Sequence, residues 1–371
     1  MTVRMNAFSA EPEGLVREEL DAVERVIRSG WWVLGTEVEA FEQAWAKQTG
    51  SAHTVGVGNG MDALEIGLRS LGIGAGDEVI TTPMTAFATV LAIMRAGATP
   101  VLADIDSETA ILDVASVERC LSPTTRAVVL VHLYGQVGPV GELTRLCEAH
   151  SIHLVEDCAQ AHGAVHEGRP VGSFGAFGAW SFYPTKNLGT FGDGGALTTQ
   201  RDDVADQARA LRNYGQSVRY VHTELGLNSR LDELHAAVLR VRLTRLDDWT
   251  ASRRATAHRY ANEIEHPEVR VLPLPAASER HVHHLFVVTC QRRADLAEHL
   301  ASSGVECLSH YPVSIHHQGP TSHLRIDPAG LPHAELHAAS CLSIPCNPFL
   351  QAIDVDQVVA TINGFPATAS T

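Results

Sequence analysis

The sequence predicts an α/β protein with a large, mostly parallel sheet. The main indication is that short β-branched runs alternate with segments of helical periodicity. The expected strands of this pattern cover 53–57, 77–81, 99–103, 126–132 and 152–156. Such alternation is typical of parallel strands joined by right-handed helical crossovers. A chain of 371 residues is also long enough for two domains, so we expect a second, smaller α+β domain at the carboxyl end.

Two helices are expected before the first strand. Apolar residues recur at helical spacing over 12–29, and Gly30 marks the end of that helix. A second helix is expected over 37–45. Trp31 and Trp32 stand between the two helices, and core packing is the more common role of such a pair, although a place in a binding site is the alternative.

A glycine-rich turn, Gly58 to Met61, follows strand 53–57 and leads into a helix. Free backbone amides at a helix amino terminus, together with the helix dipole, favour the binding of phosphate. The turn does not match a dinucleotide-binding fingerprint, because Met61 occupies the place of the third glycine. Taken alone, such a turn is also compatible with a purely structural role.

Polar residues stand at the ends of two expected strands. Asp157 and Gln160 follow strand 152–156, and Ser181 lies near the end of the next apolar strand. Because ligands of parallel sheets bind beyond the carboxyl ends of the strands, we expect these three side chains to border a site. An acidic pair such as Glu156-Asp157 is also compatible with a solvated turn.

One lysine, Lys186, lies at the centre of a loop that Pro184 and four glycines keep from becoming helical. The usual location of a lysine is an exposed surface. The alternative is a desolvated amine, whose lowered pKa allows it to form a Schiff base with a carbonyl group. The dense glycine, which permits close backbone approach to a ligand, and the hydroxyl of Ser181 favour the alternative.

The carboxyl-terminal half begins with strand 196–199 and helix 202–212. One continuous helical pattern then covers 231–265, and Pro267 ends it. We place the domain boundary inside this helix, which gives a large domain over 1–250 and a small domain over 251–371. The small domain is expected to contain strand 281–290, helix 292–303 and strand 304–308.

Composition excludes several functional classes. The net charge of −15 argues against a general binder of nucleic acids or anionic membranes, since both require clustered positive charge. No apolar run approaches the length of a membrane span, and the amino terminus lacks the pattern of a signal peptide. Seven cysteines without a Cys-x-x-Cys pair indicate reduced thiols and a cytoplasmic location. The histidine pairs 283–284 and 316–317 lack the spacing of metal ligands, so no metal is expected.

The lysine loop carries a resemblance to a known family. The stretch Ser-Phe-Tyr-Pro-Thr-Lys-Asn-Leu-Gly from Ser181, followed by Gly-Asp-Gly-Gly-Ala, resembles the cofactor-lysine signature of the pyridoxal-phosphate (PLP) dependent nucleotide-sugar aminotransferases of the DegT group. The match extends from about Gly30 to Pro348, which is nearly the whole chain. It implies a PLP-dependent transferase of fold type I and a homodimer with shared active sites.

The resemblance also implies contacts with the cofactor. Lys186 is expected to bind PLP covalently and to transfer protons, while Asp157 faces the pyridinium nitrogen. Phe87 is expected to stack on the ring, and Gln160 to bind the phenolic oxygen. The phosphate is expected to contact Gly60, Met61, Ser181 and, from the partner chain, Asn228. Met61 replaces the threonine or serine usual in the family, so only backbone amides remain at this position.

The implied reaction transfers an amino group from an amino acid, most simply L-glutamate, by way of pyridoxamine phosphate. The acceptor is expected to be a keto group of a nucleotide-linked sugar, which four residues would contact: Tyr183, Arg219, His310 and Tyr311. The motifs are most similar to those of members that act at C3 of a dTDP-3-keto-6-deoxyhexose. Amination at C4 of a dTDP-4-keto-6-deoxyhexose, or of a keto-cyclitol, stays open. A PLP-binding regulator is disfavoured, because the acidic chain has no basic DNA-binding segment.

Overall fold

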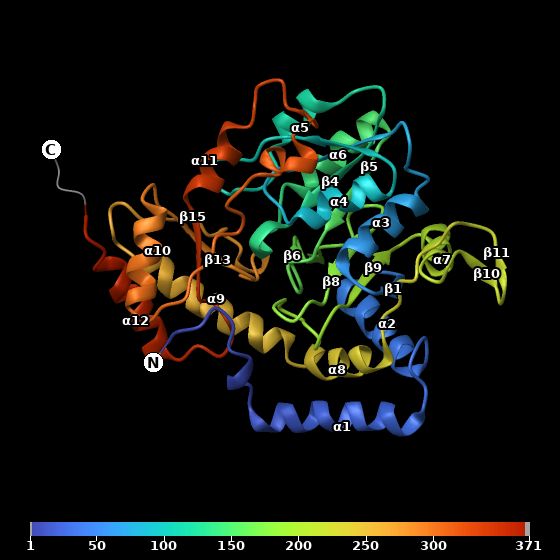
Figure 1. The fold of residues 1–371 in the computed structure, drawn as a ribbon, viewed down its shortest axis with the longest axis horizontal. Helices are drawn as coiled ribbons and strands as arrows, with labels where there is room; N and C mark the ends of the chain where they lie inside the picture. The colour runs from blue at the N-terminus through green and yellow to red at the C-terminus, as the bar shows by residue number, and fades with distance from the viewer. Residues whose placement is uncertain (1, 368–371) are drawn as a thin grey trace.

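The computed structural model describes residues 2–367, and its centre is an eight-stranded sheet (Figure 1). In spatial order the strands are β1 (His53–Val57), β9 (Gly195–Thr199), β8 (Gly178–Ser181), β5 (His153–Asp157), β4 (Thr125–Val131), β2 (Glu78–Thr81), β3 (Thr99–Leu102) and β14 (Arg325–Ile326). Strand β9 is antiparallel to both neighbours, and the other pairs are parallel. The expected mostly parallel sheet is therefore present.

Both faces of this sheet are buried. Along β4, Ala127 and Val129 belong to one buried apolar cluster, whereas Val128 and Leu130 belong to another. This alternation follows from the two-residue period of a strand, and it explains why the sequence of β4 is continuously apolar. The helices that cover the two faces and the adjoining edge are α2 (Thr36–Thr49), α3 (Gly60–Ser70), α4 (Phe87–Arg95), α5 (Val114–Cys120), α6 (Val140–His150), α7 (Asp202–Leu211) and α8 (Glu233–Leu243).

A second body with its own buried apolar cluster is formed mainly by the carboxyl-terminal third of the chain (Figure 1). Its small antiparallel sheet contains β12 (Arg270–Val271), β13 (Phe286–Thr289) and β15 (Cys341–Ile344). The helices of this part are α9 (Leu246–Glu263), α10 (Arg293–Ser302), α11 (Pro332–Ser340) and α12 (Ala352–Asn363). Strand β14 returns from this part of the sequence to the edge of the large sheet, where it pairs with β3.

The remaining elements are short or peripheral. Helix α1 (Glu13–Ser29) packs along α8, and the hairpins are β6 (Val165–His166) with β7 (Arg169–Pro170) and β10 (Gln216–Val218) with β11 (Val221–His222). Single 3-10 turns occur at Phe8–Ala10, Leu133–Gly135, Ser278–Arg280, Ile315–His317 and Gly319–Thr321. Among the described residues, no helix is both long and apolar enough to cross a membrane.

The structure corrects three expectations about individual segments. The helix expected over 231–265 is two helices, α8 and α9, with a break at Thr244 and Arg245 that no glycine or proline marks. Residues 304–308 form only isolated bridges, to Val3 and to Ser343, instead of a regular strand. The pair Trp31 and Trp32 is not part of the core, since 61% and 49% of their surfaces are exposed.

Candidate active site

The predicted cofactor residues gather at one edge of the large sheet. Asp157 ends β5 and Ser181 ends β8, and these two parallel strands are neighbours. Because the carboxyl ends of parallel strands meet at the same edge, the two side chains border the same space. The amino terminus of α3 contacts Ser181 directly, since a β-carbon on Gly60 would lie 2.8 Å from Cβ of Ser181.

The amino terminus of α3 forms a cradle of free backbone amides. Asn59 caps the helix by accepting a 2.8 Å hydrogen bond from the backbone N–H of Asp62. The N–H groups of Gly60 and Met61 have no partner among the described residues, so they are available to an anion at the positive end of the helix dipole. The side chain of Met61 packs on the core, which leaves its amide as the only polar group offered.

Residues behind the turn hold this cradle in place. The hydroxyl of Ser229 accepts a 2.9 Å hydrogen bond from the N–H of Gly58 and donates a 2.7 Å bond to the carboxylate of Asp62. A side chain on Gly195 would meet the Asn59 backbone at 2.3 Å, so this glycine allows the helix to lie directly on β9. The amides of the cradle are therefore fixed before any ligand arrives.

Asp157 is a buried carboxylate with few hydrogen-bond donors. Its Oδ2 accepts a 2.9 Å bond from the hydroxyl of Thr89, and its Oδ1 accepts a 3.1 Å bond from the backbone N–H of Ala159. Burial raises the pKa of Asp157, and the two hydrogen bonds and the nearby Lys186 amine oppose that shift. A cation placed against this carboxylate would stabilise its ionised form.

Lys186 has the electrostatic character expected of a desolvated amine. Burial lowers the pKa of Lys186 to about 8, and the Asp157 carboxylate opposes the shift. The loop is tight here: a β-carbon on Gly189 would lie 2.6 Å from the carbonyl oxygen of Pro184. Asn187 anchors the loop by donating a 2.9 Å hydrogen bond to the carbonyl oxygen of Val282, which lies in the segment before β13. The half-buried position of Lys186 and its lowered pKa favour the interpretation as a desolvated amine over that as an ordinary surface lysine.

The amide of Gln160 has a fixed orientation. Its Oε1 accepts a 2.6 Å hydrogen bond from the backbone N–H of Tyr134, so its Nε2 must face the other way. There Nε2 donates a 3.2 Å bond to the hydroxyl of Tyr311. Burial and the nearby Asp157 carboxylate raise the pKa of Tyr311 to about 12. Gln160 is thus presented as a hydrogen-bond donor to the space beside Asp157.

Phe87 is the first residue of α4 and is partly buried against the core. Two residues further on, Thr89 reaches the Asp157 carboxylate, so the first turn of α4 lies beside the site. Sequence reasoning missed Thr89, because a single sequence gives no sign of a contact between residues 68 positions apart. The only available signal was a hydroxyl in the same helical turn as Phe87.

Two of the predicted sugar-contacting residues, Tyr183 and His310, line a partly open cavity of about 230 Å³ next to the Lys186 loop. Tyr183 and Thr185 come from the loop, whereas His284 and His310 come from the carboxyl-terminal part of the chain. Burial and the Lys186 amine lower the pKa of His310 to about 4, so this imidazole is neutral near pH 7. Tyr134 donates a hydrogen bond to the carbonyl oxygen of His310 and thereby fixes the loop that bears it.

The other predicted residues lie elsewhere in this chain. Arg219 lies in the turn between β10 and β11, which project from the edge of the molecule (Figure 1). Its guanidinium lies over the neighbouring Tyr220 ring at 5.0 Å, and the structure does not bring it to the cavity of its own chain. Asn228 is exposed, and its side chain has no hydrogen bond to the described residues. Both residues therefore remain free to contact a partner.

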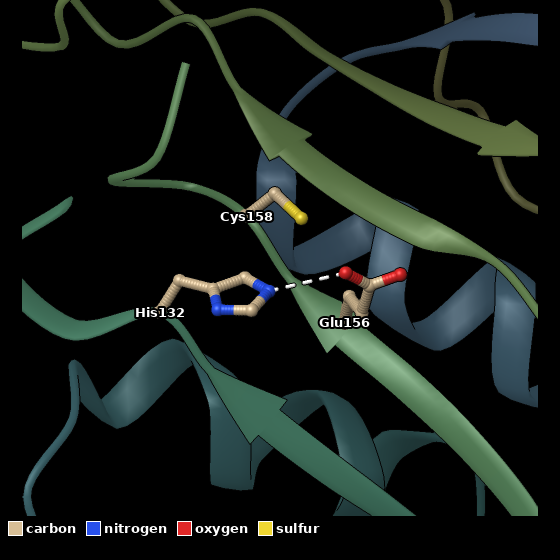
Figure 2. A group of neighbouring side chains, drawn as sticks. All are labelled: His132, Glu156 and Cys158. Carbon is tan, nitrogen blue, oxygen red and sulfur yellow. Dashed lines mark hydrogen bonds and ion pairs between the residues drawn. The ribbon is translucent and has the colours of Figure 1, made fainter. Parts of the chain in front are cut away.

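A buried trio beside the site, His132, Glu156 and Cys158, has the residue types of a metal site (Figure 2). His132 Nδ1 accepts a 3.2 Å bond from the N–H of Gly138, so its Nε2 carries the proton and donates to Glu156 at 3.2 Å. The Glu156 carboxylate also accepts three backbone bonds of 2.7–2.8 Å from loop 172–175. Hydrogen bonding therefore accounts for His132 and Glu156, which hold the strand end that carries Asp157.

These features fit the binding of PLP. The free amides of Gly60 and Met61 match a phosphate, and Asp157 needs a cation such as a protonated pyridine ring. The lowered pKa of Lys186 suits an amine that binds a carbonyl carbon. The negative phosphate and the positive pyridine ring of PLP thus each meet groups of opposite polarity in the site. The role of each residue stays a prediction.

The pKa of Lys186 leads to a testable prediction. Only the neutral amine attacks the PLP aldehyde, so the rate of PLP capture by cofactor-free protein should rise with pH and level off above about 8. Stopped-flow absorbance between pH 6 and 10 measures this rate, with roughly a tenfold loss expected for each pH unit below the pKa. A rate that keeps rising to pH 10 would show an ordinary, solvated lysine.

Comparison with known proteins identifies the family. A model of the DegT/DnrJ/EryC1/StrS aminotransferase family matches residues 14–363. The chain is 44% identical to the dTDP-3-amino-3,4,6-trideoxy-alpha-D-glucose transaminase of Streptomyces venezuelae over 349 residues, which cover 94% of this chain and 92% of that protein. It is also 44% identical to the erythromycin biosynthesis sensory transduction protein EryC1 of Saccharopolyspora erythraea over 348 residues, 94% of this chain and 95% of that protein.

The fold is shared as well. The crystal structure of S. venezuelae DesV in complex with a ketimine intermediate matches this chain with a TM-score of 0.94 and 42% identity, and the match covers 98% of each chain. The resemblance seen in the lysine loop is therefore confirmed. The chain belongs to the DegT/DnrJ/EryC1/StrS aminotransferase family and is a PLP-dependent enzyme of fold type I.

Proposed function

We propose that this enzyme transfers an amino group from L-glutamate to C3 of a dTDP-linked 3-keto-6-deoxyhexose in amino-sugar biosynthesis. The observation that supports the reaction type is the half-buried Lys186 amine, with its lowered pKa, near Asp157 and the free amides of α3. The position of amination is supported by the name of the S. venezuelae relative, which specifies a 3-amino sugar attached to dTDP. The competing activities are amination at C4 of a dTDP-4-keto-6-deoxyhexose and amination of a keto-cyclitol.

Each residue has a definite task in this proposal. PLP, when bound, supplies a ring that accepts the electron pair left when a proton leaves the amino-bearing carbon. Lys186 Nζ would remove that proton and return it to C4′ of the cofactor, and a pKa of about 8 suits a group that acts as both base and acid. Asp157 would keep the ring nitrogen protonated, Phe87 would pack on the ring, and Gln160, whose Oε1 is already bonded to the N–H of Tyr134, would donate from Nε2 to the phenolic oxygen.

Substrate binding is assigned to the cavity beside the lysine loop. The neutral His310 and Tyr183 would form hydrogen bonds to sugar hydroxyl groups in this cavity, and Tyr311 would do so from its position beside Gln160. Arg219 would bind the nucleotide diphosphate in the site of a partner chain, because its hairpin lies at the edge of its own chain. The substrates are accordingly small molecules: the nucleotide keto-sugar, L-glutamate and 2-oxoglutarate.

The homodimer belongs to the same proposal. Large apolar side chains are exposed on the segment before α2 and around the β10–β11 hairpin, and they include Trp31, Trp32, Tyr220 and Leu225. Backbone bonding anchors each of these segments: the N–H of Glu233 in α8 donates to the carbonyl oxygen of Trp32, and Asn228 bridges to Asn213 at the base of the hairpin. An exposed apolar surface of this kind is typical of an interface with a second copy.

Two further proposals concern organisation and location. We retain the division into domains 1–250 and 251–371, which the separate buried cluster of the small body supports, while β14 crosses back to the large sheet. A cytoplasmic location is supported by the thiols: all seven cysteines are free, and six of them are buried.

A turnover panel tests the substrate. Purified enzyme with L-glutamate is offered the 3-keto and 4-keto forms of a dTDP-6-deoxyhexose and a keto-cyclitol, and aminated products are measured by mass spectrometry. We expect the 3-keto sugar to be favoured about tenfold or more in kcat/KM, because selectivity depends on differential transition-state binding. Preference for the 4-keto sugar or the cyclitol would contradict the proposal. PLP binding without turnover of any acceptor would favour a regulator.

A further inference from the structure

The carboxylate of Asp157 is the end of a chain of two threonine hydroxyls. Thr89 Oγ1 lies 2.9 Å from Asp157 Oδ2, and Thr85 Oγ1 lies 2.8 Å from Thr89 Oγ1. All three side chains are buried. An ionised carboxylate only accepts hydrogen bonds, so the proton of Thr89 must point at Asp157, and the proton of Thr85 must then point at Thr89. The hydrogen-bond direction along the chain is therefore fixed.

Few other groups act on this carboxylate. The backbone N–H of Ala159 occupies Oδ1, while the Lys186 amine acts on Asp157 through its charge. Among residues 2–367, Thr89 is the one side chain whose hydroxyl, amide or amine forms a hydrogen bond with Asp157. A charge-assisted bond of this kind is about twice as strong as a neutral one, and more so where water is excluded.

We propose that Thr89 is a positioning residue that holds Asp157 ionised and oriented toward the ring nitrogen of PLP, with Thr85 polarising the Thr89 hydroxyl. This inference rests on the proposed role of Asp157. It adds a second task to the first turn of α4, because Phe87 packs on the flat face of the ring while Thr89 acts through the carboxylate at its edge. Thr89 itself need not contact the cofactor.

A purely structural role for Thr89 makes a different prediction. A threonine inside a helix commonly donates its proton to the carbonyl oxygen one turn earlier. Thr89 of helix α4 instead donates to the Asp157 carboxylate at the end of strand β5, 68 residues further along the chain. The helix itself does not depend on this bond. Valine has nearly the shape of threonine, so Thr89→Val removes the hydroxyl with little change in packing. Loss of function in a well-folded Thr89→Val protein would then report on Asp157.

The experiment measures the ring nitrogen directly. Enzyme is loaded with PLP labelled with ¹⁵N in the ring, and the ¹⁵N chemical shift and the dissociation constant of PLP are recorded. In Thr89→Val we expect the shift to move toward that of an unprotonated ring and the PLP dissociation constant to rise about tenfold, as for one lost bond to a charged group. Thr89→Ser should restore both quantities, because it keeps the hydroxyl.

Two further variants separate the possible failures. Thr54→Val removes another buried threonine hydroxyl, one without a hydrogen-bond partner, and should match wild type. Asp157→Asn should move the ¹⁵N shift further than Thr89→Val does. If Asp157→Asn moves the ¹⁵N shift and Thr89→Val does not, the proposed role of Thr89 is wrong. The same conclusion follows if Thr89→Ser changes the ¹⁵N shift and the PLP dissociation constant as much as Thr89→Val does. If neither Asp157→Asn nor Thr89→Val moves it, the assignment of Asp157 fails.

Discussion

Replacing Lys186 with alanine is expected to abolish both the visible absorbance of bound PLP and transamination. The amine is the group that binds the cofactor carbon and moves the proton, so turnover should fall by about 10,000-fold, the upper range for a positioned acid–base group. Borohydride treatment of the wild-type enzyme should reduce the carbon–nitrogen double bond between lysine and cofactor. The cofactor mass should then appear on the peptide that contains Lys186, as measured by mass spectrometry.

The chain supplies an unusually clean control for this experiment. Only two lysines occur in the sequence, Lys47 and Lys186, and Lys47 is exposed on α2. A Lys47→Ala protein therefore has a single lysine, and it should retain the visible band, the label and full turnover. Cofactor mass on the Lys47 peptide, or a visible band that survives in Lys186→Ala, would show that the reactive amine had been misassigned.

The sequence predicted those parts of the fold that local patterns determine. Strand β1 has the bounds expected from the sequence, and helix α7 ends one residue earlier than expected, because local apolar patterns mark both elements. Asp157 and Ser181 were placed at strand ends by the same reasoning, and the structure brings them to one edge of the sheet. A pattern of strands and helices is sufficient to place such residues, because topology determines where strand ends meet.

The features that were missed depend on contacts between distant segments. The helix break at Thr244 follows Arg242, whose buried guanidinium pairs with Glu11 and Glu19 more than two hundred residues earlier. The link from Thr89 to Asp157 is of the same kind. The prediction for Trp31 and Trp32 was wrong for a different reason. Both side chains are large and apolar, as core residues are, but their own chain leaves about half or more of their surface exposed. Burial by a second copy would reconcile their composition with their exposure.

The position of Asn228 leaves open which chain's cofactor it serves. The next residue, Ser229, supports the α3 cradle of its own chain through its bond with the N–H of Gly58. Consecutive residues of extended chain point to opposite sides, so Asn228 faces away from that contact and is exposed. The proposal that it reaches the partner's phosphate therefore requires a test that distinguishes the two chains.

Mixing two inactive variants provides that test. Asn228→Asp places a carboxylate beside the cofactor phosphate, and repulsion between the two anions should inactivate it. Lys186→Ala is inactive for the reason given above. If Asn228 serves the partner, a heterodimer of the two variants has one site with both lesions and one with neither. Isolated heterodimers should then have about half of wild-type activity, because one of their two sites is intact, and an unfractionated random mixture about a quarter, because half of its dimers are heterodimers.

The matched control mixes Lys186→Ala with Asp157→Asn. Both of these residues belong to the site of one chain, since each shifts the pKa of the other within this structure. Every site in that heterodimer carries one lesion, so no activity above the parent variants should return. Recovery with Asn228→Asp but not with Asp157→Asn is the expected result, measured as transamination after heterodimers are isolated by two affinity tags. If isolated heterodimers stay inactive in both mixtures, Asn228 acts within its own chain and the shared site is wrong.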